Sequence, residues 1–205
     1  MPAGDYLTIA GPGHAQTRVL GSRFLGTATP LQSEEEVATL LDAERKRSYD
    51  ATHWCYAYRW SVDNDLIEKP ADAGEPRGTA GPPILREIQK RELLQCLVIV
   101  TRYFGGTKLG TGGLARAYGE CAALCLDAAP TRLVETRSQF RVECPYELQN
   151  AVYTVAHRHS ATVEVLPPSE RAVFLVTAKP ATMPALLAAL NEAGSGRMDV
   201  REVAR

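Results

Sequence analysis

The sequence predicts an α+β protein with two domains. Strand-like apolar segments alternate with helix-like segments along the chain, and a second rhythm, β-α-β-β-α-β, begins after Pro130. This second rhythm is the element order of the ferredoxin-like split βαβ fold. We therefore expect residues 1–16 to form a flexible tail, residues 17–130 an amino-terminal domain, and residues 131–205 a ferredoxin-like carboxy-terminal domain.

Seven segments are expected in the amino-terminal domain. Ser33 precedes three acidic residues, as an N-cap precedes the first turn of a helix. The segment 95–104 is almost entirely apolar, which is typical of a strand in the middle of a sheet. In chain order we expect a strand over 18–29, a helix over 34–49, a strand over 52–60, a loop over 61–83, a helix over 84–94, a strand over 95–104 and a helix over 114–129.

The carboxy-terminal domain is predicted from the same kind of signals. Pro145 opens a helix, and Gly194 and Gly196 end another. The expected elements are a strand over 131–144, a helix over 145–159, strands over 161–166 and 171–178 joined by a hairpin turn at 167–170, a helix over 181–193 and a strand over 197–203.

The composition excludes several classes of protein. Hydrophobic residues make up 45% of the 205 residues and charged residues 23%, which excludes collagen-like, low-complexity and intrinsically disordered chains. The net charge of −1 means that any basic surface is local. The first residues lack the pattern of a signal peptide, so we expect none. No apolar run reaches about 20 residues, and the five cysteines suit reduced, buried thiols. We expect a cytoplasmic protein with no membrane contact and no metal site.

The strand predicted over 52–60 carries both tryptophans of the protein. Alternation places Trp54, Tyr56, Tyr58 and Trp60 on one face. Such a row packs beneath a helix more often than it stacks on nucleic-acid bases, so we favour the core. His53 and Cys55 lie on the other face without a third group to orient them, and no catalytic residue is predicted.

The segment 102–119 is glycine-rich and basic, and it lies between a buried strand and a helix. Glycines let backbone N–H groups converge, and a helix N-terminus favours anions. No acidic residue interrupts this segment. We therefore predict a phosphate- or nucleic-acid-binding site made of Arg102, Gly105, Gly106, Lys108, Gly110, Gly112, Gly113 and Arg116. The alternative is a purely structural turn that allows a tight strand–helix crossing.

Two nucleotide-binding motifs do not fit this segment. A P-loop requires Gly-Lys-Ser/Thr, but Lys108 is preceded by a threonine and followed by a leucine. The spelling G-x-G-x-x-A occurs at Gly110, Gly112 and Ala115, but it does not directly follow its strand, and no repeated βαβ units accompany it. We therefore predict no cofactor.

A second loop, over 72–85, combines prolines and glycines that shape the backbone. We expect four of its residues to support the anion site, by hydrogen bonds within the loop or by pairing with the arginines of the glycine-rich segment: Asp72, Glu75, Arg77 and Thr79. The alternative is that the carboxylates of Asp72 and Glu75 act in acid–base or magnesium chemistry.

These two loops resemble the signature segments of the YigZ/IMPACT family. The matching segments are GEPRGTAGPPIL at 74–85 and VTRYFGGTKLGTGGLARAYG at 100–119, with HWCYAYRW and SRFLG in the same pattern. The resemblance implies an amino-terminal α/β sandwich with a left-handed βαβ crossover, like domain IV of elongation factor G and the GHMP kinases. For bacterial members it implies a ferredoxin-like second domain, like domain V of that factor.

The chain departs from the family pattern in one loop. The usual Asp-Asp-Gly-Glu-Pro reads Asp-Ala-Gly-Glu-Pro at 72–76, and Arg77 replaces a small residue. Losing a carboxylate weakens a metal or acid–base role, and the added arginine favours an anionic partner.

The resemblance implies a role linked to translation. Our first hypothesis is a non-enzymatic module that binds RNA or the ribosome through its basic glycine-rich loop. The alternatives are an enzyme that acts on a phosphorylated small molecule and a protein-interaction regulator of translation factors. The sequence does not indicate an oligomeric state.

Overall fold

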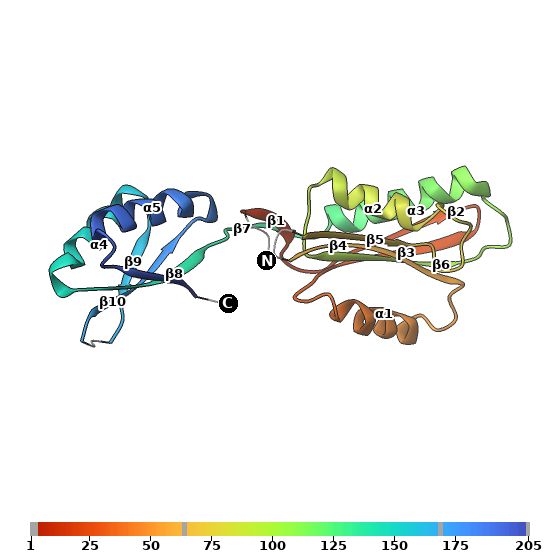
Figure 1. Ribbon diagram of the computed structural model, residues 1–205. Coiled ribbons are helices and arrows are strands. Elements are labelled where there is room, and N and C mark those ends of the chain that lie inside the picture. The colour runs from red at the N-terminus through yellow and green to blue at the C-terminus, as the bar shows by residue number, and fades with distance from the viewer. Residues whose placement is uncertain (1–3, 63–64, 168–169, 204–205) are drawn as a thin grey trace. The chain divides into compact units, whose positions relative to one another are not determined.

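The computed structural model describes residues 4–62, 65–167 and 170–203 and divides the chain into two compact units, Met1–Val134 and Glu135–Arg205. Figure 1 shows the elements of both units. Each unit contains its own sheet, helices and apolar core. The secondary structure is mixed α+β in both, as predicted.

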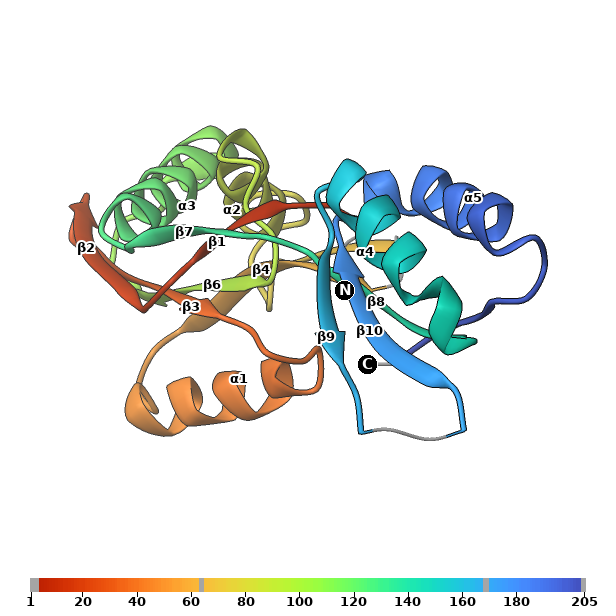
Figure 2. The same cartoon turned by 90° about the vertical axis from the view of Figure 1, so that its left-hand side faces the viewer.

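The first unit is built on a five-stranded antiparallel sheet. Its spatial order is β2 (Gly13–Val19), β3 (Ser22–Pro30), β6 (Cys96–Tyr103), β4 (His53–Val62) and β5 (Asp65–Ala71). Because β3 and β4 both pair antiparallel with β6, they run parallel to each other, and the connection between them is a crossover. Figures 1 and 2 show one face covered by α1 (Glu36–Arg47) and the other by α2 (Gly81–Lys90) and α3 (Gly110–Asp127).

The central strand β6 separates two apolar cores. Leu97 and Ile99 face α1, whereas Val98 and Val100 face α2 and α3. The prediction of a central strand buried on both faces is therefore confirmed. Tyr58 is buried on the α1 side, where Tyr56 and Trp60 pack against the same core. This part of the aromatic row is core packing, as we favoured.

The second unit confirms the ferredoxin-like order. It contains β8 (Ser138–Cys144), α4 (Gln149–Arg158), β9 (Thr162–Val165), β10 (Ala172–Ala178), α5 (Met183–Gly194) and β11 (Asp199–Glu202). The antiparallel sheet has the order β11-β8-β10-β9, and both helices pack on its apolar core. The hairpin turn predicted at 167–170 lies partly outside the described residues, since 168–169 are not described.

The flexible tail predicted for residues 1–16 is wrong for residues 4–16; residues 1–3 lie outside the described residues. β1 (Tyr6–Ile9) pairs antiparallel with β7 (Thr131–Val134), and β2 already begins at Gly13. Ile9 is completely buried in the core beneath α3. The local sequence lacks an apolar period because the pairing partner of this segment lies more than a hundred residues away. β7 also belongs to the first unit, so the unit boundary follows Val134.

Two further predictions missed strands. The single strand expected over 18–29 is a hairpin of β2 and β3, whose turn at Leu20 and Gly21 has φ of 46° and 82°. A two-residue turn with both φ values positive suits a tight hairpin, but Leu-Gly lacks the usual Asn or Asp signal. The loop expected over 61–83 contains β5, which is an edge strand with charged residues and a proline.

Three element boundaries also differ. The helix expected over 84–94 is α2 and begins at Gly81, and the helix expected over 114–129 is α3 and begins at Gly110. The strand expected over 131–144 divides into β7 and β8. The early start of α3 places Gly110, Gly112 and Gly113 in its first turn rather than in a loop.

Candidate functional site

Both family-type loops lie at one end of the sheet of the first unit. β6 ends at Tyr103, next to the start of β4, because Arg102 pairs with His53. The loop that follows β5 is held at the same place, since His53 Nδ1 lies 3.1 Å from the Ala73 carbonyl oxygen and donates to it. The sheet register therefore brings together segments that are far apart in the sequence.

Arg102 lies beneath this end of the sheet and is only 5% exposed. Its Nη1 donates to Glu75 Oε1 at 2.6 Å and its Nη2 to Ser22 Oγ at 3.2 Å. The side chain points to the face that α2 and α3 cover, as alternation along β6 requires. Contrary to its predicted role, Arg102 is a structural cation and does not present a free charge to a ligand.

Glu75 is shared by several segments. The Tyr118 hydroxyl donates to Glu75 Oε1 at 2.8 Å, and His53 Nε2 lies 3.9 Å from the same oxygen. Burial, reinforced by Cys55 and Glu75, raises the pKa of Tyr118 far above its usual range, so this phenol stays protonated and donates. Glu75 thereby connects its loop to β4, β6 and α3.

Asp72 also has a structural role. Its carboxylate accepts hydrogen bonds from the backbone N–H groups of Gly78, Ala80 and Gly81 at 2.7 to 2.9 Å, so it caps the start of α2. Burial alone would raise the pKa of Asp72, but these three donors and the nearby Arg77 charge outweigh it and lower the pKa.

Thr79 closes the same loop by donating to the Pro76 carbonyl oxygen at 2.6 Å. The Cys55 thiol donates to the Asp72 carbonyl oxygen at 2.9 Å, and burial raises its pKa to about 12. Cys55 is therefore a neutral thiol and not a nucleophile at physiological pH. The carboxylates of Asp72 and Glu75 thus stabilise the fold. This agrees with the expectation that the loop is held by internal hydrogen bonds and by pairing with an arginine of the glycine-rich segment.

The glycine-rich segment packs closely at one point and is open elsewhere. A Cβ on Gly105 would lie 1.9 Å from the Gly21 carbonyl carbon, so the segment touches the β2–β3 turn at a distance that only glycine allows. Gly106 and Gly110 have φ of 85° and 71°, and a Cβ on either, or on Gly112, would meet nothing within 4 Å. The backbone before α3 is exposed.

The predicted cations do not form one cluster. Lys108 is exposed in the loop before α3, and it makes no ion pair with any described residue. Arg116 lies on α3, where it lines a hollow between α2 and α3 together with Arg86 and Lys90. With Arg102 buried, only Lys108 remains free at the glycine-rich loop itself.

Sequence reasoning missed a second set of residues beside this loop. The sheet register places three side chains opposite one another on the face of the sheet where α1 packs: Arg18 of β2, Arg23 of β3 and Tyr103 of β6. Arg23 Cζ lies 4.2 Å from the centroid of the Tyr103 ring. The ring of Phe104 is 48% exposed and lies 5.5 Å from Arg102 Cζ. We call Arg18, Arg23, Tyr103 and Phe104 the arginine–aromatic platform.

The platform is a shallow hollow without negative charge. Its described lining residues are Arg18, Leu20, Gly21, Arg23, Tyr103 and Phe104, none of which is acidic. Gly105 joins the hollow to the loop that carries Lys108, because it packs on Gly21. The signal that could have revealed this site is the hairpin: once β2 and β3 pair, both arginines fall on one face.

Other kinds of site have less support in the described part of the chain. No three His, Cys, Asp or Glu side chains among the described residues are close enough together to hold a metal ion. None of the helices that the structure describes has the length and apolar character of a membrane span.

Comparison with known proteins identifies the family. The family model described as the Impact N-terminal domain matches residues 20–126, which include both loops of the site. The chain belongs to the IMPACT family. An IMPACT family member of Haemophilus influenzae is 30% identical over 183 residues, which cover 88% of each chain. The family resemblance of the two loops is thus confirmed.

Another relative matches a shorter part of the chain at higher identity. The IMPACT family member YvyE of Bacillus subtilis is 43% identical over 116 residues, which cover 57% of this chain and 53% of that protein. The chain therefore matches about half the length of this relative. A crystal structure of a hypothetical protein superposes with a TM-score of 0.64 at 22% identity and covers 98% of both chains, which supports the two-domain fold.

Proposed function

We propose that this IMPACT family protein binds single-stranded RNA through the first unit, as a non-enzymatic module linked to the regulation of translation. The observation that supports this function best is the arginine–aromatic platform beside Lys108. It combines cations that face no acidic neighbour with the exposed ring of Phe104 and the half-buried ring of Tyr103 at one end of a sheet. Surfaces of this kind hold phosphates by charge and bases by stacking.

The two contributions come from different side chains. Arg18 and Lys108 are exposed and make no ion pair within the described chain, so their charges are available to phosphates. Phe104 exposes nearly half of its surface while its ring rests near the buried Arg102 guanidinium. A base stacking on Phe104 meets a ring that is already fixed in place, which reduces the entropy lost on binding.

The start of α3 adds a place for one phosphate. The residue at its N-cap position, Leu109, provides no side-chain hydrogen bond, and its first turn contains no acid. The glycines at 110 and 112 leave open space next to the backbone of this turn, whose first N–H groups have no partner within the helix. The proposed interface therefore keeps the predicted glycine-rich loop. Its cations are Arg18 and Arg23 instead of the buried Arg102.

The test is fluorescence anisotropy with labelled oligouridine and with an RNA duplex of equal length. Three cations on the phosphates of a single strand predict a salt slope of roughly −2, so the affinity falls about 20-fold between about 50 and 200 mM salt. Lys108→Gln reduces this slope by about 0.7, whereas Phe104→Ala weakens binding about tenfold at both salt concentrations.

Arg86→Gln is the matched control, because Arg86 is also an exposed cation of the first unit without an ion pair but lies on α2. This variant is expected to bind oligouridine as the parent does. Equal losses in the Arg86 and Lys108 variants would contradict an interface limited to the platform and the glycine-rich loop. No binding at low salt would refute RNA binding and leave the protein-interaction alternative.

The enzyme alternative has less support in the geometry. The Asp72 carboxylate accepts hydrogen bonds from three backbone N–H groups, and the Glu75 carboxylate accepts hydrogen bonds from Arg102 and Tyr118. Neither is placed to take a proton from a substrate or to hold a metal ion without breaking these contacts.

A further inference from the structure

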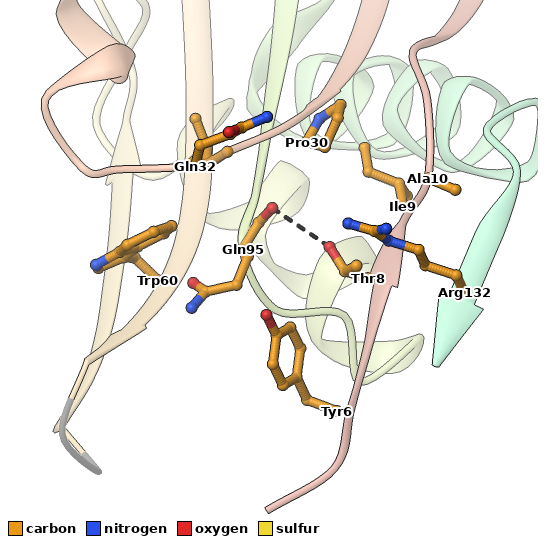
Figure 3. A pocket seen from close by; sticks show the side chains of 10 residues that line it. Tyr6, Thr8, Ile9, Ala10, Pro30, Gln32, Trp60, Gln95 and Arg132 are labelled. Atoms are coloured by element: carbon orange, nitrogen blue, oxygen red, sulfur yellow. Dashed lines mark hydrogen bonds between the residues drawn. The ribbon is translucent and has the colours of Figure 1, made fainter. Parts of the chain in front are cut away.

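A separate cavity lies at the opposite end of the same sheet (Figure 3). Its volume is about 350 Å³, which is enough for a small organic molecule. Trp60, in its wall, lies seven residues along β4 from His53, which corresponds to roughly 23 Å of extended strand. The cavity is thus remote from the arginine–aromatic platform, and its proposed role does not depend on RNA binding.

The floor of the cavity is fixed before any ligand binds. Gln95 adopts a φ of 56° and is 3% exposed. Its side chain accepts from the Ser61 N–H at 3.0 Å and donates to the Ser61 carbonyl oxygen at 2.8 Å. Its own carbonyl oxygen accepts from the Leu31 N–H at 2.8 Å and from Thr8 Oγ1 at 3.4 Å. These bonds connect β1 and β4 with the residue that follows β3 and the residue that precedes β6.

The cavity has an excess of positive charge. The guanidinium of Arg132, on β7, makes no hydrogen bond or ion pair with any described residue, and none of the described lining residues is acidic. Figure 3 shows its guanidinium reaching toward Thr8 and the Tyr6 hydroxyl pointing toward Gln95. A guanidinium is a planar fork of donors that suits a carboxylate or phosphate group.

The remaining wall is apolar and partly flat. The indole ring of Trp60 lines one side, and the apolar side chains of Pro30, Leu31 and Ile9 line other parts of the cavity. Aromatic rings favour flat partners, which they contact by stacking or by their edges. An anion without an apolar body would leave this wall without a contact, and a neutral ring would leave Arg132 without a counter-charge.

We propose that this cavity binds a small planar organic anion. Its carboxylate or phosphate group pairs with the Arg132 guanidinium, and its ring packs against Trp60. The carboxylate and the phosphate present the same chemistry to Arg132, so both are compared below.

The test follows the fluorescence of Trp60 in the full-length chain. Trp54→Phe leaves Trp60 as the single tryptophan, because the protein contains two. Benzoate and phenyl phosphate are expected to change the emission in a saturable way. Benzamide, which is planar and neutral, and inorganic phosphate, which has no ring, are expected to bind at least about tenfold more weakly.

Arg132→Gln is expected to weaken benzoate or phenyl phosphate binding about tenfold or more, whereas Arg86→Gln, on α2, leaves it unchanged. Calorimetry on the protein with both tryptophans repeats the comparison without the Trp54 substitution. Saturation by only one of the two anions supports the proposal and identifies the group that Arg132 prefers. Equal binding of benzamide, an unchanged Arg132→Gln variant, or no saturation by either anion would overturn it, whatever the outcome of the RNA experiment.

Discussion

The ion pair between Arg102 and Glu75 joins distant segments of the first unit. Both side chains are nearly inaccessible, with 6% and 3% of their surface exposed. Ser22 and Tyr118 add hydrogen bonds from β3 and α3. Because a buried charge without its partner is costly, this pair holds the end of the sheet on which the platform stands.

Arg102→Met is expected to lower the free energy of unfolding by about 3–5 kcal/mol, since Glu75 is left buried without its cation. Urea unfolding followed by tryptophan fluorescence measures this change in the first unit, where both tryptophans lie. Lys108→Met, the removal of an exposed cation, is the control and should change stability by less than about 0.5 kcal/mol. In a double-mutant cycle with Glu75→Gln, strictly additive losses would contradict a coupled pair.

Asp72 makes the stability of the first unit depend on pH. Its pKa is lowered in the folded state, so its carboxylate stabilises the fold above the unfolded value near 3.8, and this stabilisation is lost as the pH falls through the folded pKa. Asp72→Asn should therefore cost about 1–2 kcal/mol at neutral pH. Urea titrations at several pH values should show the difference between the two proteins shrinking below about pH 5. A difference that does not depend on pH would contradict a role for the charge.

At the scale of elements, the β2–β3 turn and the glycine-rich segment depend on each other. Gly105 approaches the Gly21 backbone so closely that any side chain forces the two apart. This contact determines where the loop with Lys108 lies relative to the arginines of the hairpin. The platform is therefore a property of two paired elements and not of either motif alone.

Gly105→Ala is expected to destabilise the first unit by about 1–3 kcal/mol, because the new Cβ overlaps the Gly21 backbone. Gly112→Ala is the matched control: its Cβ meets nothing within 4 Å, and it lies in the first turn of α3. Alanine favours a helix over glycine by up to about 1 kcal/mol, so this variant should be neutral or more stable. Thermal unfolding measures both, and equal effects would show that the contact with Gly21 is unimportant.

At the scale of the molecule, the first unit includes both ends of the segment 4–134. β1 supplies Ile9 to the core and pairs with β7, whose last residue is Val134. Each unit buries its own apolar side chains in its own core. The two cores of the first unit thus contain no residue of the second unit's core, as expected for separate domains.

A fragment of residues 1–134 is therefore expected to unfold cooperatively, with a transition close to that of the same unit in the full chain. A fragment of residues 17–130, the predicted domain, lacks β1, β7 and half of β2, and it should be markedly less stable or unfolded. Tryptophan fluorescence during urea unfolding distinguishes them, since both retain Trp54 and Trp60. Equal midpoints would show that β1 and β7 contribute nothing to the first unit.

Local patterns were enough for much of the fold. The apolar run of β6 predicted a central strand, and the rhythm after Pro130 predicted the ferredoxin-like order. Prediction failed where a strand is polar or pairs far away, as for β5 and β1. For the site, one expectation was that the loop with Glu75 pairs with arginines of the glycine-rich segment, and Glu75 does pair with Arg102. The assignment of Arg102 to a ligand was wrong, because the local sequence does not show that this pair is buried.

The sequence by itself determined the family, the α+β class and the helices and strands with strong periodicity, because these depend on residues close together along the chain. Only the tertiary structure decided that Arg102 is buried, that Arg18 and Arg23 join Tyr103 on one face, and that Trp60 and Arg132 line one cavity. The reason is physical: strand register and helix packing bring these side chains together, and both arise from long-range contacts that no local pattern records.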